Sequence, residues 1–148
     1  MKKKIAIILV LAMIAGCLAA CGKQASEPGT DGDGKEIKIG ALYPTQSISF
    51  CQEIRRGVEE AAAEFGFKTV ECVYDLDADK GVEMMRNLIV QQVDAIVLHS
   101  VYSDAFAAPT QEAMDAGIPV ITVDGMVNTE VTTFVASDNT QGGTLAGE

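Results

Sequence analysis

The chain of 148 residues is 48% hydrophobic, which is enough for the core of one domain of ordinary size. It carries 21 acidic and 11 basic residues, so its formal net charge is −10 at pH 7. A surface this acidic repels nucleic acid and anionic lipid headgroups, and neither is expected as a binding partner.

The first twenty residues have the layout of a secretion signal. Three lysines at positions 2–4 precede an uncharged apolar run from Ile5, and small residues come before Cys21. The segment LAAC, which ends at Cys21, resembles the lipobox of bacterial lipoproteins, in which the cysteine is acylated and becomes the mature N-terminus. Residues 1–20 are therefore predicted to be a lipoprotein signal peptide, with Cys21 as the lipidation site.

Two other interpretations of this leader are open. The segment IAGC, ending at Cys17, also fits the lipobox but shortens the apolar run. The second interpretation is an uncleaved anchor helix, because the length of the apolar run is near the lower limit of about 18 residues for spanning a membrane. Either way, the chain is expected to be exported and tethered to the outer face of the cytoplasmic membrane. Cleavage before Cys21 removes three lysines and no acidic residue, so the mature charge becomes −13.

After the leader, a linker precedes a folded domain. Residues 21–35 consist largely of Gly, Pro, Ser and Asp without an apolar period, which predicts a flexible tether. From residue 36 onward, strand-like and helix-like segments alternate, and they predict a domain over 36–139. The predicted strands are residues 36–43, 67–74, 93–100, 118–124 and 132–137.

Three helices are predicted between these strands. Residues 48–66 place apolar side chains at steps of three and four, and Gly66 supplies the stop. This inner face would use Cys51, Ile54, Val58, Ala61, Ala62 and Phe65.

The second and third helices have candidate caps. Asp79 is predicted to cap the second helix, whose inner face would use Val82, Met85, Leu88 and Ile89. Ser103 is predicted to cap the third, which would run to Ala116, with Gly117 as its stop. Pro109 would lie inside this helix and distort it.

The alternation of strands and helices predicts an α/β fold with a doubly wound parallel five-stranded sheet in the order 2-1-3-4-5. The third and fourth strands are continuously apolar, as strands covered on both faces are. In such sheets ligands bind beyond the carboxyl ends of the strands. Here those ends are residues 43–50, 99–102, 124–126 and 137–139.

Signatures of catalysis and of metal binding are absent from the sequence: it has no GxSxG, HExxH, Walker lysine loop or GxGxxG. Residues 75–86 imitate a calcium loop at Asp75, Asp77 and Asp79, but Lys80 and Arg86 stand where such a loop needs Gly and Glu. A solvated loop with a helix cap is the simpler interpretation, and no metal or cofactor is expected.

Cys51 and Cys72 are the cysteines of the folded part. Export permits a disulfide between them, and two free, half-buried thiols are the alternative. Neither a CxxC motif nor a His pair accompanies them, so a metal site is not expected there.

Three side chains at the predicted ligand edge have two interpretations each. Asp124 ends an apolar strand, where a carboxylate can accept hydrogen bonds from two ligand hydroxyls or can cap the turn with Gly125. Phe50 could offer a flat face to a sugar ring or staple its helix. His99, the single histidine of the chain, could contact ligand or serve packing and hydrogen bonding.

Several segments together resemble the N-terminal lobe of the type 1 periplasmic sugar-binding proteins, the ribose- and galactose-binding group that serves ABC transporters. They are IKIGALYP, GVEEAAAEFGFKTV, VDAIVLHSVYSDAF, AMDAGIPVITVDG and VASDNTQGGTLAGE, spanning about Ile37 to Glu148. No single segment is diagnostic, but their order and spacing together make the resemblance strong. Regulators of the lac-repressor type share the fold but carry a DNA-binding head.

The resemblance implies two lobes that close on a ligand about a hinge. Residues 36–139 would be the first lobe and 140–148 the start of the second, whose remainder is not in this sequence. By position, Phe50 matches a ring-stacking aromatic and Asp124 a hydroxyl-binding carboxylate, while Asn139 lies at the crossing beside the cleft. Gly125 stands where ribose-type members have Arg, and Cys51 where they have a second aromatic, so ribose is disfavoured.

The function expected from the resemblance is that of a solute-binding lipoprotein of an ABC importer, which captures a sugar or polyol and delivers it to the permease without doing chemistry. Phe50, His99, Asp124 and Asn139 are its candidate ligand-binding residues. A sensory binding module that presents ligand to a membrane receptor and a small flavodoxin-like enzyme are the alternatives.

Overall fold

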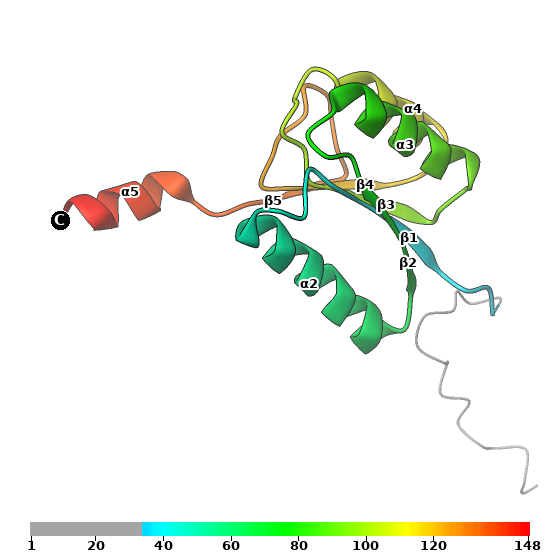
Figure 1. Cartoon of the computed structure of the whole chain (residues 1–148), viewed down its shortest axis with the longest axis horizontal. Coiled ribbons are helices and arrows are strands. Elements are labelled where there is room, and N and C mark those ends of the chain that lie inside the picture. The colour runs from blue at the N-terminus through cyan, green and yellow to red at the C-terminus, as the bar shows by residue number, and fades with distance from the viewer. Residues whose placement is uncertain (1–33) are drawn as a thin grey trace, which may run out of the picture.

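The computed structural model describes residues 34–148, and the predicted leader with Cys21 lies outside them (Figure 1). The strands are β1 (Lys38–Tyr43), β2 (Lys68–Val73), β3 (Ala95–Leu98), β4 (Val120–Val123) and β5 (Thr133–Val135). The helices are α2 (Ser49–Phe65), α3 (Ala78–Val90), α4 (Ala107–Asp115) and α5 (Asn139–Gly147).

The five strands form one sheet in the order β2-β1-β3-β4-β5, and every neighbouring pair is parallel. This confirms the predicted fold class and strand order. The chain steps from β1 to one side for β2 and to the other side for β3. The loops after β1 and β3 therefore lie at the point where the winding reverses, which is where open α/β sheets bind ligands.

The main hydrophobic core lies between the sheet and the pair α3 and α4. Ile96, Leu98 and Val120 point to this side and are fully buried. They belong to the same cluster as Met85 and Leu88 of α3, which are also fully buried. Burial of one such side chain contributes roughly 1.5–3 kcal/mol, so this layer positions the strand ends firmly.

Among the helices of residues 34–148, α2 alone covers the opposite face of the sheet; Figure 1 shows it below the sheet, while α3 and α4 lie above it. On the predicted inner face of α2, Cys51 is buried, and Ile54 and Val58 are half-buried. Phe65, the last residue of the helix, was also predicted to face inward, but its exposed fraction is 59%. This side of the lobe is thinly covered.

Two predicted helix starts are wrong. Asp77, not Asp79, caps α3 by accepting a hydrogen bond from the backbone N–H of Lys80. The third helix starts at Ala107 rather than after Ser103, because the fully buried ring of Phe106 packs on Tyr74 with ring centroids 5.3 Å apart and fixes the chain just before the helix.

Pro109 and the two glycine stops follow from the same boundaries. Pro109 lies in the first turn of α4, where a backbone N–H has no partner within the helix, so it does not distort the helix as predicted. Gly66 and Gly117 follow α2 and α4 with φ of 77° and 80°, the left-handed conformation that the predicted stops require.

The last helix, α5, projects away from the sheet (Figure 1). All its residues are exposed, and its start is capped by the Asp138 carboxylate, which accepts from the backbone N–H of Gln141 at 2.9 Å. Across residues 34–148, none of the helices has both the length and the apolar character that crossing a membrane requires.

Candidate functional site

Three of the four predicted site residues meet at the carboxyl edge of the sheet. Phe50 comes from the start of α2, His99 follows β3, and Asp124 follows β4. The rings of Phe50 and His99 meet edge to face, with centroids 5.9 Å apart and planes at 83°. The His99 Nε2 atom lies 3.8 Å from Oδ2 of Asp124. Aromatic, imidazole and carboxylate groups thus share one corner.

Asn139 is not brought into this corner. It is the first residue of α5 and is exposed, and its backbone N–H donates to the carbonyl of Ser137. Its predicted place beside a cleft would require a second lobe that faces this edge of the sheet.

Asp124 is held in a strained backbone conformation. Its φ is 61°, and it is the central residue of a three-residue turn in which the Gly125 N–H donates to the Val123 carbonyl at 2.7 Å. Turns of this kind with positive φ are rare and strained. The Asp124 N–H in turn donates to the Val135 carbonyl at 2.8 Å, so β5 anchors the turn.

The Asp124 carboxylate itself points outward, with the side chain 42% exposed. In the described part of the chain it accepts no hydrogen bond, and its near polar neighbour is the His99 imidazole. The geometry therefore gives no support to the alternative in which this carboxylate caps its own turn, and leaves its oxygens open to a ligand.

Steric crowding explains why glycine follows Asp124. A Cβ atom at position 125 would lie 1.7 Å from the carbonyl oxygen of Ser100, which is buried in the loop after β3. The loops that follow β3 and β4 touch backbone to backbone here. The arginine that ribose-type proteins carry at this position could not be placed without moving one of these loops.

The imidazole of His99 is buried, with only 3% of the residue exposed. Burial lowers its pKa, and the nearby Asp124 carboxylate opposes this with a smaller upward effect. His99 is therefore neutral at neutral pH. Its Nδ1 atom has no hydrogen-bond partner among the described residues. The ring both packs against Phe50 and faces Asp124, so the two interpretations of His99 are compatible.

Cys51 and Cys72 are free thiols, so the alternative of a disulfide between them is not realised. Cys51 is 4% exposed, and its thiol pKa is raised by burial and further by Asp124. It is therefore a protonated, apolar neighbour of the site. Where ribose-type proteins have a second aromatic ring, this lobe has a small buried side chain beside Phe50.

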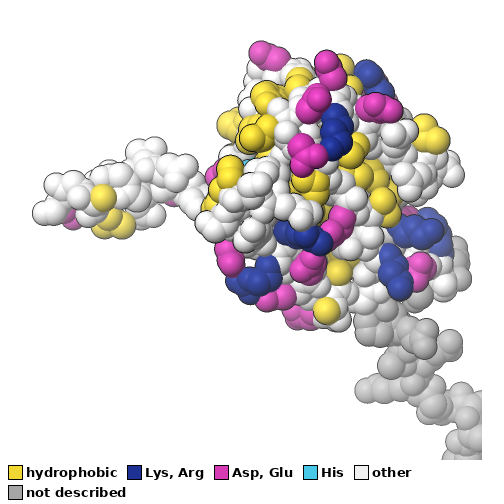
Figure 2. Space-filling view, in the orientation of Figure 1, with side chains coloured by type: hydrophobic (Ala, Val, Ile, Leu, Met, Phe, Trp, Pro, Cys, Tyr) yellow, Lys and Arg dark blue, Asp and Glu magenta, His cyan; other side chains and the backbone are white. Residues whose placement is uncertain are grey.

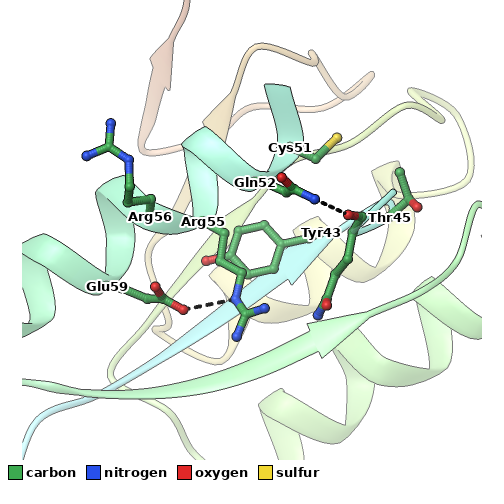
Figure 3. Close-up of a pocket in the computed structure, with 8 residues that line it drawn as sticks. Tyr43, Thr45, Cys51, Gln52, Arg55, Arg56 and Glu59 are labelled. Atoms are coloured by element: carbon green, nitrogen blue, oxygen red, sulfur yellow. Dashed lines mark hydrogen bonds and ion pairs between the residues drawn. The ribbon is translucent and has the colours of Figure 1, made fainter. Parts of the chain in front are cut away.

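A cavity of about 340 Å³ beside α2 was not predicted. It opens next to the site, and Figure 3 shows its lining. The Tyr43 hydroxyl is buried there without a hydrogen-bond partner in the described residues, and burial raises its pKa. The Arg55 guanidinium is held by Glu59 at 3.0 Å and by Glu71 at 2.7 Å. The residues lining the cavity are Tyr43, Thr45, Gln46, Cys51, Gln52, Arg55, Arg56 and Glu59.

The sequence indicates only part of the lining of this cavity. Arg55 and Glu59 have the i, i+4 spacing of a helical ion pair, but nothing in the sequence shows that Tyr43 lies beneath them. Figure 2 shows acidic and basic side chains interspersed over the α2 side of the lobe, and Arg56 on this helix pairs with both Glu53 and Glu60.

The aspartates that imitate a calcium loop serve other contacts. Asp75 pairs with Lys80 at 2.6 Å, and Asp77 caps α3. Over residues 34–148, no cluster of three or more His, Cys, Asp or Glu side chains has a geometry that could hold a metal ion.

Comparison with known proteins identifies the family. Residues 39–148 match the periplasmic binding protein domain, which is most of the chain. The chain belongs to the periplasmic binding protein family. This is a family of binding proteins and not of enzymes, which removes the flavodoxin-like enzyme as an alternative.

Two known proteins have sequences similar to this chain. The ribose import binding protein RbsB of Bacillus subtilis (strain 168) is 33% identical over 150 residues, covering 99% of this chain and 48% of that protein. The ribose operon repressor of Halalkalibacterium halodurans is 32% identical over 110 residues, 74% of this chain and 31% of that protein.

Solved structures show the same lobe. An ABC transporter periplasmic solute-binding protein from Actinobacillus succinogenes 130z, with bound D-allose, is 30% identical with a TM-score of 0.58, over 63% of this chain and 32% of that one. The chain thus spans about half the length of the Bacillus relative and about a third of the other two proteins.

Proposed function

We propose that this chain is the first lobe of a lipid-anchored sugar-binding protein that serves an ABC importer. The observation that carries the proposal is the corner formed by Phe50, His99 and Asp124 at the carboxyl edge of the sheet. The exposed ring of Phe50 can stack on a sugar ring, and the Asp124 carboxylate, which accepts no hydrogen bond from the described residues, can accept hydrogen bonds from the sugar hydroxyls.

The ligand class is a sugar or related polyol. The D-allose bound by the Actinobacillus protein and the ribose named for the Bacillus relative support this class without naming the ligand here. D-ribose itself is disfavoured, because Gly125 supplies no guanidinium and cannot be replaced by a larger residue without displacing Ser100. His99 and Asp124 would orient the ligand in place of the missing guanidinium.

A second lobe would complete the site. The relatives are two to three times longer than the part this chain matches. We assign residues 140–148, most of which lie in α5, to the first helix of that second lobe, and Asn139, the first residue of α5, to the crossing. Capture would then proceed by closure of the two lobes about this hinge, without chemistry.

A panel titration tests the ligand class. Thermal shift of the two-lobed protein against sugars, polyols and nucleosides should find its stabilising ligands among the sugars and polyols, because a ligand that binds the folded state raises its stability. Stabilisation by nucleosides alone would reject the proposal. Permease and ATPase genes beside the coding sequence would support an importer, whereas a histidine kinase gene would support a sensory module.

Membrane attachment is tested separately. Mass spectrometry of the membrane fraction should find Cys21 as an acylated N-terminus. An unmodified N-terminus at Met1 would reject the anchor, and acylation at Cys17 would move the site.

A further inference from the structure

Helix α2 begins at an unusual residue. Ile48 occupies its N-cap position, with an extended backbone at φ −106° and ψ 126°, and its side chain makes no cap hydrogen bond. Serine, threonine, aspartate and asparagine are preferred there, because their side-chain oxygens accept from the first N–H groups of a helix. The Ile48 side chain is not sunk into the core either, since 49% of the residue is exposed. The lobe therefore gains little stability from an isoleucine at this position.

Ile48 is one of three exposed apolar residues that each lie two positions from a residue of the proposed site. They are Ile48 beside Phe50, Val101 beside His99, and Met126 beside Asp124. Their exposed fractions are 49%, 50% and 63%. We call Ile48, Val101 and Met126 the apolar rim. Large apolar side chains gathered on an exposed surface mark a place where something binds.

The three segments that carry the apolar rim meet at one edge of the sheet. The loops after β3 and β4 touch at Ser100 and Gly125, and the residues that directly follow these two belong to the apolar rim. The ring of Phe50 meets that of His99 with centroids 5.9 Å apart, so the start of α2 reaches the same place. The apolar rim therefore shares its segments with the polar groups of the site.

Two small residues leave room for a ligand larger than ribose. Cys51 is buried where ribose-type proteins have a second aromatic ring, and Gly125 stands where they have arginine. Neither position fills the site with a large side chain or adds a charge to it. The additional space is thus next to apolar side chains and not next to a guanidinium.

A second lobe that closes over this edge would be another way to cover the apolar rim. Its residues, however, alternate with the ligand-binding candidates along the same short segments. A ligand held by Phe50 and Asp124 would therefore lie against the apolar rim and keep a second lobe from it. The arrangement favours the ligand as the group that covers these side chains.

We infer that the ligand is a glycoside, a sugar that carries an uncharged apolar substituent, with its sugar ring on Phe50 and Asp124 and its substituent against the apolar rim. This deepens the proposed function and rests on it. A free sugar would leave Ile48 and Met126 facing hydroxyl groups or water. Each CH₂ group that the apolar rim removes from water should strengthen binding roughly four-fold.

Calorimetric titration of the two-lobed protein tests this inference. The probes are the n-butyl glycosides of D-allose, D-glucose and D-galactose, each compared with its free sugar. At least one butyl glycoside should bind about ten-fold or more tightly than its free sugar, because about two of its CH₂ groups are buried. 1-Butanol alone should not bind at the same concentrations, because it lacks the sugar ring.

Ile48→Ser separates the apolar rim from folding. Serine is a preferred N-cap residue, so this variant should resist urea at least as well as the wild type. The advantage of the butyl glycoside over its free sugar should nevertheless fall to about three-fold or less, as two lost CH₂ contacts require. Met126→Ser should reduce the advantage in the same direction. The matched control is Val90→Ser at the last residue of α3, which is 80% exposed, and it should leave the advantage unchanged.

The outcomes separate the inference from the proposed function. Equal affinity for free and butylated sugars, with binding still weakened by Asp124→Ala, would overturn the inference and leave the proposed function standing. So would a butyl advantage that survives both Ile48→Ser and Met126→Ser, or an Ile48→Ser variant that weakens both forms alike, as expected if a second lobe covers the apolar rim. If no sugar or glycoside binds, or if Asp124→Ala weakens none of them, the proposed function is contradicted and the inference falls with it.

Discussion

The carbonyl oxygen of Ser100 lies where a side chain at position 125 would begin, 1.7 Å from the place of a Cβ atom on Gly125. This contact closes the loops after β3 and β4 on each other. It places His99, one residue before Ser100, opposite Asp124, one residue before Gly125. The site therefore depends on a backbone contact that glycine alone allows.

Gly125→Ala should lower the free energy of unfolding by about 1–3 kcal/mol, because the new methyl group forces one loop away from the other. The matched control is Gly57→Ala in the middle of α2, where no atom outside the neighbouring residues and backbone of the helix lies within 4 Å of the new methyl group. That change should stabilise the lobe by roughly 0.5–1 kcal/mol, through helix propensity. Urea denaturation measures both, and equal effects would show that the loops do not touch.

The fold was largely predictable from the sequence. Strand-like and helix-like segments alternate, and two strands are apolar on both faces, so few sheet topologies are possible. The helix starts were less so, since the packing of Phe106 outweighed the capping propensity of Ser103. The positions of Phe50, His99 and Asp124 at one edge followed from the strand order. The contact of Ser100 with Gly125 did not, because no sequence pattern reports the spacing of two loops.

His99 should make stability depend on pH in a definite direction. Its folded pKa lies below its ordinary value of 6.5, so the unfolded chain binds a proton that the folded chain does not. The stability it contributes is present above pH 6.5 and is lost as the pH falls through the folded pKa. His99→Gln should flatten the dependence in this window. Lys35 lowers the pKa of Asp94, and Arg86 lowers that of Glu112. These two carboxylates change the stability only at more acidic pH.

Calorimetric unfolding in buffers of different ionisation enthalpy measures this proton uptake. Because the chain has one histidine, an uptake just below pH 6.5 in the wild type and none in His99→Gln would be assigned without ambiguity. A variant with the same uptake as the wild type would show that His99 is not buried as a neutral ring.

Arg55 should contribute more to stability than its neighbour Arg56. Arg55 joins α2 to β2 through Glu71, with both side chains partly buried at 33% and 25% exposure, whereas Arg56 pairs with exposed residues of its own helix. Arg55→Ala should lower the free energy of unfolding by about 1 kcal/mol, and Arg56→Ala should leave it nearly unchanged because water screens its exposed ion pairs. The reverse order in denaturant titrations would exclude the bridge between α2 and β2.

The last helix should be the least stable element of the lobe. All its residues are exposed, and Gly142, Gly143 and Gly147 disfavour a helix this short without packing. Hydrogen exchange of the chain should show little protection over 140–148, while Leu88 in the fully buried face of α3 exchanges slowly. Strong protection in α5 would mean that it packs against something in solution, such as a second copy of the chain.

Asp124→Ala in the two-lobed protein tests the central claim most directly. With an anchored backbone and an exposed carboxylate, Asp124 can be truncated without disturbing the core. Calorimetric titration with the sugar found in the panel should show affinity reduced about ten- to a hundred-fold, as the loss of a charge-assisted hydrogen bond of about 1.5–3 kcal/mol requires. The control Asp79→Ala should bind like the wild type. Unchanged affinity in Asp124→Ala would contradict the account and leave Asp124 as a turn residue only.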